Sequence, residues 1–119
     1  MPARLRNLYA DAGATWRERL LLPAVLVAPD LTGYHALVHV RRAADLYAPV
    51  MLALDSAAEG DELSLDVASR VVTFAVPGPV LAAVPPGSWV WDLVVVSADG
   101  NDRARVFEGL LQIRASVSA

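Results

Sequence analysis

The chain has 119 residues, no cysteine and a formal net charge of −3. This length suits one domain with its own hydrophobic core. The absence of cysteine excludes disulfides and thiolate metal sites. The slight acidic excess argues against nucleic-acid binding, which usually requires a strong basic excess.

Apolar residues make up 55% of the sequence. The longest uncharged stretch, Val71 to Trp91, contains prolines that prevent the continuous helix of ~20 residues required by a bilayer. The N-terminus carries Arg4 and Arg6 but no apolar run with a cleavage site, so we expect no secretion signal. The high apolar content has two interpretations: a full core, or an apolar surface buried against other subunits.

Residues 1–13 show neither a long helical period nor a strand period, and we expect them to form an extended N-terminal arm. A strand is expected over 14–22, because Trp16 and Leu20 lie on one face of a two-residue alternation. Glu18 falls on the same apolar face. This strand is therefore expected to lie at the edge of a sheet or to have its pattern broken at Glu18.

Residues 23–33 contain turn-forming residues and are expected to connect the first strand to the next. Residues 34–41 alternate between apolar and polar positions, which is typical of a half-buried strand. Three further short strands are expected at Val50–Leu54, Leu63–Asp66 and Val72–Val76. The proline-rich segment 77–86 is expected to cross between two sheets, with one helical turn at 80–84.

Two long β-rich runs, 87–96 and 103–114, flank a polar segment that contains Asp99-Gly100. Asp-Gly between such runs is the strongest short-range signal for a β-hairpin. On the first strand, the residues expected to share the core face are Trp89, Trp91, Leu93 and Val95. On the second strand, they are Arg105, Phe107, Gly109, Leu111 and Ile113.

About seven short strands, with turn signals at intervals of about ten residues, indicate an all-β fold. The specific expectation is an antiparallel immunoglobulin-like β-sandwich. Its domain covers residues 14–115, and a C-terminal tail follows at 116–119.

No group of residues in the sequence predicts catalysis, a cofactor or a metal site, so we do not expect an enzyme. His35 and His39 are four residues apart in an expected strand, where about 13 Å separates them, too far to share an ion. An acidic segment lacks the spacing of a calcium-binding loop and is expected to be solvated. Its members are Asp55, Glu59, Asp61, Glu62 and Asp66.

Asp92 interrupts the apolar first strand of the hairpin, and its alternation from Trp91 places it on the outer face. We expect a cross-strand hydrogen bond or ion pair, with an arginine of the last strand as one candidate partner. Catalysis would need a second group that the sequence does not place there. Val90, Val94 and Val96 share this outer face. Either the strand is central and covered on both sides, or its outer face is an assembly surface.

Several short motifs follow one another along the chain. They are Asp11-Ala12-Gly13-Ala14-Thr15-Trp16, Asp30-Leu31-Thr32-Gly33-Tyr34, Pro86-Gly87-Ser88-Trp89-Val90-Trp91-Asp92-Leu93, Ala98-Asp99-Gly100 and Arg105-Val106-Phe107-Glu108-Gly109. Together they resemble a family of small phage and prophage virion proteins, and are similar to the N-terminal domain of phage baseplate upper proteins. The resemblance covers most of 11–113. It implies a non-enzymatic part of the particle, such as a neck (head–tail connector), head-decoration, baseplate or fibre-attachment protein.

The expected function is therefore multivalent docking within a virion, in multiple copies, on capsid, neck, tail or fibre subunits. No cofactor, nucleic acid or membrane is expected as a partner. The residues expected to contact other proteins are Leu5, Leu8, Tyr9, Val25, Leu26, Val27, Asp99 and Asp102.

The alternative is a carbohydrate- or small-ligand-binding sandwich that uses tryptophans and loop acids. It predicts at least one tryptophan exposed at a loop end. The docking hypothesis instead predicts that Trp89 and Trp91 are buried.

Overall fold

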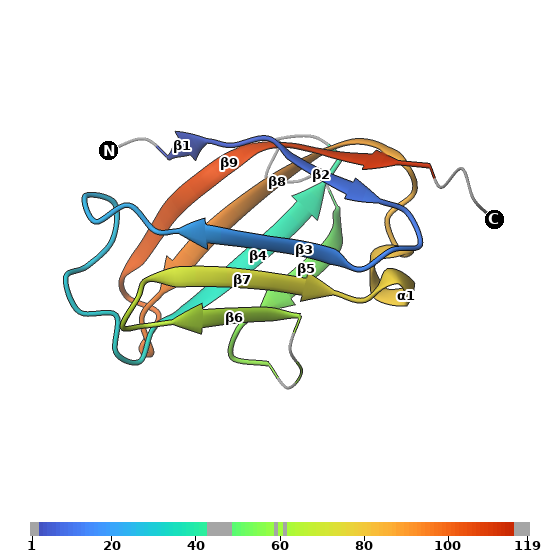
Figure 1. The fold of residues 1–119 in the computed structure, drawn as a ribbon. Helices are drawn as coiled ribbons and strands as arrows, with labels where there is room; N and C mark the ends of the chain where they lie inside the picture. Colours follow the sequence, from blue (N-terminus) through green and yellow to red (C-terminus); the bar gives the residue numbers. More distant parts are fainter. Residues whose placement is uncertain (1–2, 43–48, 59, 61, 116–119) are drawn as a thin grey trace.

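The computed structural model describes residues 3–42, 49–58, 60 and 62–115. Two β-sheets face each other in this part of the chain (Figure 1), which confirms the prediction of an all-β sandwich. The larger sheet contains β1 (Arg4–Leu5), β2 (Leu8–Asp11), β4 (His35–Arg41), β5 (Val50–Asp55), β8 (Gly87–Val96) and β9 (Arg103–Arg114). The smaller sheet contains β3 (Trp16–Leu21), β6 (Leu63–Asp66) and β7 (Val71–Val76). The expected tail at 116–119, and the acids Glu59 and Asp61, lie outside the described residues.

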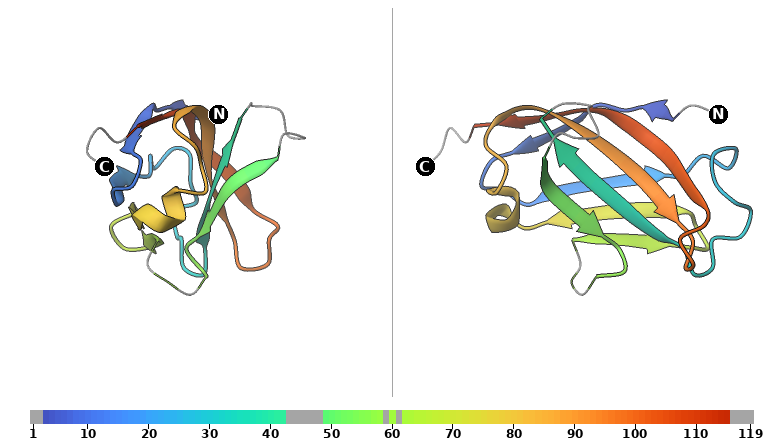
Figure 2. Two further views of the ribbon diagram at one scale, coloured as in Figure 1. Left: turned by 90° about the vertical axis from the view of Figure 1, so that its right-hand side faces the viewer. Right: turned by 180° about the vertical axis from the view of Figure 1, so that it is seen from behind.

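The strand order is β1-β9-β8-β4-β5 in the larger sheet, with β2 also paired to β9, and β3-β7-β6 in the smaller sheet. Figure 2 shows the layers from the side and the larger sheet from behind. The larger sheet is mixed, because β1 and β2 run parallel to β9 while its other described pairs are antiparallel. The predicted antiparallel pairing therefore holds for the described strands within 14–115, and the parallel pairs come from the N-terminal segment that was expected to be an arm. β3 lies at a sheet edge, as the position of Glu18 predicted.

The N-terminal segment is paired with β9 and does not project as an arm. In β2, Leu8 lies opposite Leu111 and Ala10 lies opposite Ile113, and both β2 side chains are buried in the core. β2 lies near the N-terminus and β9 near the C-terminus, and the two strands pair in parallel. The segment therefore completes one edge of the larger sheet.

The approach of this segment to β9 depends on Gly109. A Cβ at position 109 would lie 2.2 Å from the Arg6 carbonyl oxygen, so no larger residue fits while Arg6 keeps its place. The same oxygen accepts a hydrogen bond from the Trp91 indole N–H at 2.8 Å. The Asn7 side-chain oxygen accepts one from the Leu110 backbone N–H at 3.1 Å.

The alternation predicted for the hairpin is correct on β8 and partly wrong on β9. All four inward residues predicted on β8 are buried. On β9, Arg105 was expected to face the core, but the register shifts between Leu93 and Val94, where these residues lie opposite Phe107 and Arg105. Val106 is the extra residue of this β-bulge, and a bulge reverses the facing of the residues before it. Arg105 is consequently directed to the outer face, opposite Val94.

Aromatic rings connect the two sheets through the core. The Trp16 and Phe74 ring centroids, on neighbouring strands of the smaller sheet, are 5.0 Å apart. The Phe74 ring meets Trp91 of the larger sheet edge-on at 6.3 Å, and Trp91 stacks at 6.3 Å on Phe107. Such pairs add to the stabilisation that comes from burying their apolar area.

The proline-rich crossing contains α1 (Gly78–Leu81), two residues before the helical turn that was predicted. Pro79 fits the start of a helix, because the backbone N–H that proline lacks has no intrahelical partner there. The segment leads from β7 in the smaller sheet to β8 in the larger sheet, as predicted. Within the described ranges, no helix has the length and apolarity that a membrane crossing requires.

Candidate interaction surfaces

One candidate surface is a groove at the end of the sandwich where the connector between β3 and β4 meets the start of β9. It has a volume of about 300 Å³. Its lining residues, which define the end groove, are Ala3, Val25, Leu26, Arg103, Ala104 and Arg105. The Val25 side chain is 65% exposed, whereas Leu26 and Val27 are half-buried. Val25 and Leu26 of the connector therefore lie beside the start of β9, almost eighty positions further along the chain. The sequence did not predict this contact.

Hydrogen bonds fix the connector beside the hairpin. The Asp30 carboxylate accepts bonds from the Thr32 hydroxyl at 2.7 Å and the Thr32 backbone N–H at 2.9 Å, and these bonds lower the pKa of Asp30. At the end of the connector, the Tyr34 hydroxyl donates to the Asp102 carboxylate, and this bond raises the pKa of Tyr34. The connector is thus attached to the β8–β9 turn by its last residue.

The two predicted contact acids of the turn already accept hydrogen bonds within the chain. Asp99 accepts from the Ser97 hydroxyl and from the Asn101 backbone N–H, which lowers its pKa. Asp102 accepts from Tyr34, and its own backbone N–H donates to the Ser97 oxygen at 3.0 Å. Both acids are exposed. They shape the turn, and a contact with another protein stays a prediction.

The three predicted contact residues of the N-terminal segment lie on different faces. Leu5 and Tyr9 are 77% and 61% exposed. Leu8 is only 2% exposed and packs in the core, so the prediction that it reaches a partner is wrong. The short alternation of 8–11, with apolar residues at positions 8 and 10, was the available signal that this segment is a strand with one buried face.

The second candidate surface is the side of the larger sheet that is turned away from the smaller sheet, and we call it the outer sheet face. No described element covers it (Figure 2). The register places these residues on it: Leu5, Tyr9, Leu37, His39, Arg41, Val50, Val90, Asp92, Val94, Arg105, Glu108 and Leu110. β8 lies between β9 and β4, so the expectation that it is a central strand is correct. The expectation that both of its faces are covered is not met by the described elements. Val90 and Val94 are half-buried among their neighbours.

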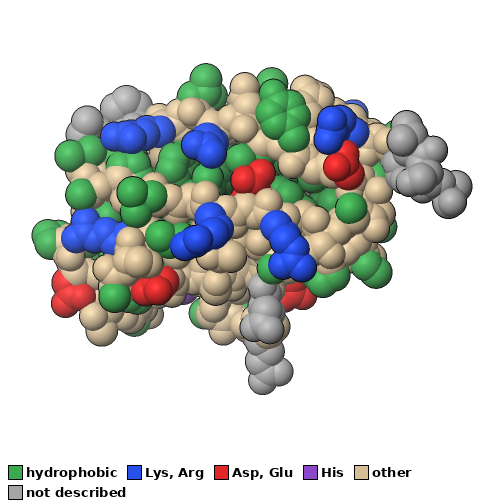
Figure 3. All heavy atoms as spheres, viewed as in Figure 1, with side chains coloured by type: hydrophobic (Ala, Val, Ile, Leu, Met, Phe, Trp, Pro, Cys, Tyr) green, Lys and Arg blue, Asp and Glu red, His purple; other side chains and the backbone are tan. Residues whose placement is uncertain are grey.

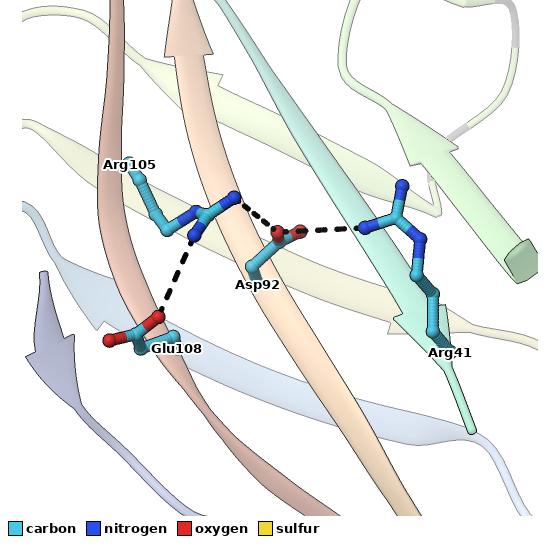
Figure 4. A network of polar contacts seen from close by, with 4 residues as sticks. All are labelled: Arg41, Asp92, Arg105 and Glu108. Carbon is cyan, nitrogen blue, oxygen red and sulfur yellow. Dashed lines mark ion pairs between the residues drawn. The ribbon is translucent and has the colours of Figure 1, made fainter. Parts of the chain in front are cut away.

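Asp92 forms the centre of an ion cluster on this face (Figure 4). One carboxylate oxygen lies 3.5 Å from Arg105 and 3.9 Å from Arg41. Arg105 also approaches Glu108 at 3.8 Å. The predicted ion pair with an arginine of the last strand is therefore confirmed. The pairing with Arg41 was missed, although both residues sit on the same face by alternation.

The Asp92 carboxylate will be worth more to stability than the Glu108 carboxylate. The Asp92→Asn variant is expected to lose about 1–3 kcal/mol of unfolding free energy, because Arg41, 17% exposed, then keeps a largely buried charge without its partner. The matched Glu108→Gln variant, whose pair is 46% and 47% exposed, should lose under about 0.5 kcal/mol. Urea denaturation of both variants measures the difference. Equal losses would show that Asp92 has no special place in the cluster.

The structure also places the histidines, acids and tryptophans considered for metal or ligand binding. Among them, no group of three or more histidine, aspartate or glutamate side chains could hold a metal ion. His35 and His39 both lie on β4, as expected for a strand. All three tryptophans are buried, at 2% exposure or less, so the burial predicted for Trp89 and Trp91 is confirmed. The ligand-binding alternative therefore lacks the exposed tryptophan that it predicted.

The fold and these surfaces define an all-β sandwich with two candidate docking surfaces, the end groove and the outer sheet face. Comparison of the chain with models of known protein families and with curated proteins gives no match.

Proposed function

We propose that this chain is a non-enzymatic, immunoglobulin-like structural component of a tailed-phage virion that acts by docking, in multiple copies, on other virion proteins. The observation that carries the proposal is the end groove, where the predicted contact residues Val25 and Leu26 lie beside the start of β9. An exposed valine beside two arginines around one hollow suits a protein contact that combines apolar and charged groups. Repetition in a particle makes such small contacts strong through avidity.

The strand order supports the immunoglobulin-like part of the proposal. We equate β3, β7 and β6 with strands B, E and D of that fold, and β4, β8 and β9 with strands C, F and G, on the basis of the strand order. The strands that often carry a disulfide between the sheets, B and F, here carry Trp16 and Trp91. Phe74 lies between these two rings, so aromatic packing takes the place of a covalent link.

The phage assignment rests on the sequence motifs between Asp11 and Gly109 that resemble virion proteins. The structure gives several of them a physical role that fits a docking scaffold. Asp30 and Thr32 shape the connector, Asp99 shapes the hairpin turn, and Gly109 admits the N-terminal strand. These residues shape loops and a strand contact of the sandwich, which is what a docking scaffold requires.

The groove is tested by replacing Val25 with aspartate. Particles from cells that carry the gene are purified on a density gradient, and the amount of chain per particle is measured by mass spectrometry. The wild-type chain should travel with the particles, and Val25→Asp should reduce its amount at least about tenfold, because the introduced charge is desolvated in the contact. The matched control is Val67→Asp, at an exposed valine just after β6.

The control should leave incorporation within about twofold, since Val67 does not line the end groove and an exposed substitution outside a contact changes little. Absence of the wild-type chain from purified particles would contradict the virion proposal. Equal incorporation of Val25→Asp and Val67→Asp would leave the virion proposal standing and remove the end groove from it.

A further inference from the structure

We infer that the outer sheet face is the docking site for a second copy of this chain, related to the first by a two-fold axis. This inference rests on the proposed docking function and deepens it by naming one partner. The outer face of β8 was expected to be either covered within the chain or an assembly surface, and the inference selects the assembly surface.

Exposed apolar side chains converge on this face from separate strands. Leu5, Tyr9, Leu110 and Val50 are 77%, 61%, 43% and 41% exposed, and the register directs all four away from the smaller sheet. They come from β1, β2, β9 and β5, and therefore span the sheet from edge to edge. Half-buried valines of β8 lie between them. Exposed apolar side chains gathered on one face typically mark a protein contact.

The charges of the face are complementary to themselves. The ion cluster holds two arginines and two acids, so it is neutral as a group. Its two most exposed members, Arg105 and Glu108, carry opposite charges three residues apart on β9. A two-fold axis near them sets Arg105 of one copy against Glu108 of the other, and the reverse, as an isologous interface requires. Opposite charges facing each other favour the correct pairing and fix its register.

The opposite side of the sandwich does not have this property. The outer face of the smaller sheet carries Arg17 and Arg19, both exposed on β3, and Asp66, exposed on β6. In Figure 3, which views the molecule from that side, arginine side chains stand out on the surface. A two-fold axis near β3 would bring the arginines of the two copies together. Like charges across an interface suppress association.

The outer sheet face is large enough for a stable contact. Five strand positions at ~4.8 Å spacing and ten residues of β8 at ~3.3 Å each give roughly 24 Å by 33 Å, on the order of 600–800 Å² per copy. A standard specific interface buries about 800 Å² on each partner. The face therefore suits one more copy without help from another surface.

The first test compares two leucine-to-aspartate variants by sedimentation equilibrium. The wild-type chain should show a monomer–dimer equilibrium with Kd below about 100 µM. Leu110→Asp, on the outer sheet face, should raise Kd at least about 100-fold, since a two-fold interface contains the substitution twice and each is worth about tenfold. Leu21→Asp, at a 67% exposed leucine on the smaller sheet, should leave Kd within about twofold.

A wild-type chain that stays monomeric up to about 1 mM would overturn the inference, because so weak an association is outside the range of specific interfaces. Equal effects of Leu110→Asp and Leu21→Asp would also overturn it. A monomer that still travels with purified particles would remove the dimer and keep the proposed function. A dimer that is absent from purified particles would keep the dimer and remove the proposed virion function.

The second test uses charge complementation between copies. The Glu108→Arg variant has arginine at both positions 105 and 108. The Arg105→Glu variant has glutamate at both positions. Each variant alone should dimerise at least about tenfold more weakly, and an equal mixture should recover the dimer as a mixed pair. Failure of the mixture to associate, with both variants folded by tryptophan emission, would overturn the two-fold arrangement. If Arg105→Glu does not fold, the Leu110→Asp and Leu21→Asp pair still decides the question.

Discussion

Replacing Phe74 with alanine is expected to lower the free energy of unfolding by about 3–5 kcal/mol. Phe74 is fully buried and its ring contacts Trp16 on one side and Trp91 on the other. Its removal leaves a cavity at the centre of the core, between the two sheets. The surrounding strands cannot close this cavity, because each is held in register by its neighbours.

The matched control for this prediction is Phe107→Ala, since the chain has only these two phenylalanines. Phe107 is 6% exposed and stacks on Trp91 alone. Its loss should cost at least about 1 kcal/mol less than the loss of Phe74, because fewer aromatic contacts disappear and water reaches the site more easily. Urea denaturation gives both values. A Phe107→Ala variant that is the less stable of the two would contradict the central role of Phe74.

Tryptophan fluorescence gives an independent readout of the same core. In the wild-type chain all three indoles are buried, so acrylamide should quench their emission weakly. In the Phe74→Ala variant, Trp16 and Trp91 both border the new cavity, and quenching should rise under native conditions. Unchanged quenching with a large loss of stability would mean that the core closes around the gap.

Much of this fold could be predicted from local patterns because its central strands are buried on one face. β4 alternates throughout and β8 alternates from Trp89 to Val95, and the side chains that alternate inward are the buried ones. Val96, which was expected on the outer face, is an exception because it is buried at 3% exposure. The Asp-Gly turn identified the hairpin because its geometry suits the twist of paired strands. The outward position of Asp92 followed from the same alternation, and the structure adds Arg41 and Arg105 as its partners.

The errors have physical causes that a local pattern cannot reveal. The bulge at Val106 inserts one residue into β9, and the sequence around it alternates acceptably in either register, so Arg105 was assigned to the wrong face. The pairing of the N-terminal segment with β9 joins positions about one hundred residues apart. Burial of Leu8 and Ala10, hydrogen bonds of Arg6 and Asn7, and the ion pair between Asp11 and Arg114 fix that contact, and none of these partners is close in the sequence. Only part of the end groove could be predicted. Val25 was expected to contact a partner, but Arg103, which lines the same groove, comes from a strand far away in the sequence.

The N-terminal strand itself can be tested through Gly109. A Gly109→Ala substitution is expected to cost about 2–4 kcal/mol of unfolding free energy, from overpacking and from hydrogen bonds that break when the strand retreats. The added Cβ would lie 2.2 Å from the Arg6 carbonyl oxygen and 3.0 Å from the Asn7 side-chain oxygen. Moving Arg6 away breaks its bond to Trp91, and moving Asn7 breaks its bond to Leu110.

The same substitution should expose the N-terminal segment to protease before the whole domain unfolds. Trypsin cleaves after arginine, and Arg4 and Arg6 lie in this segment, so cleavage there should speed up at least about tenfold if the strand detaches by local opening. The matched control is Gly100→Ala in the hairpin turn, where φ is +77° and no atom lies within 4 Å of the added Cβ. That variant bears the strain of a left-handed residue, about 1 kcal/mol, without a clash. It should lose stability and keep the wild-type cleavage rate after Arg6. If Gly109→Ala also keeps that rate, the N-terminal strand does not depend on the close approach that Gly109 permits.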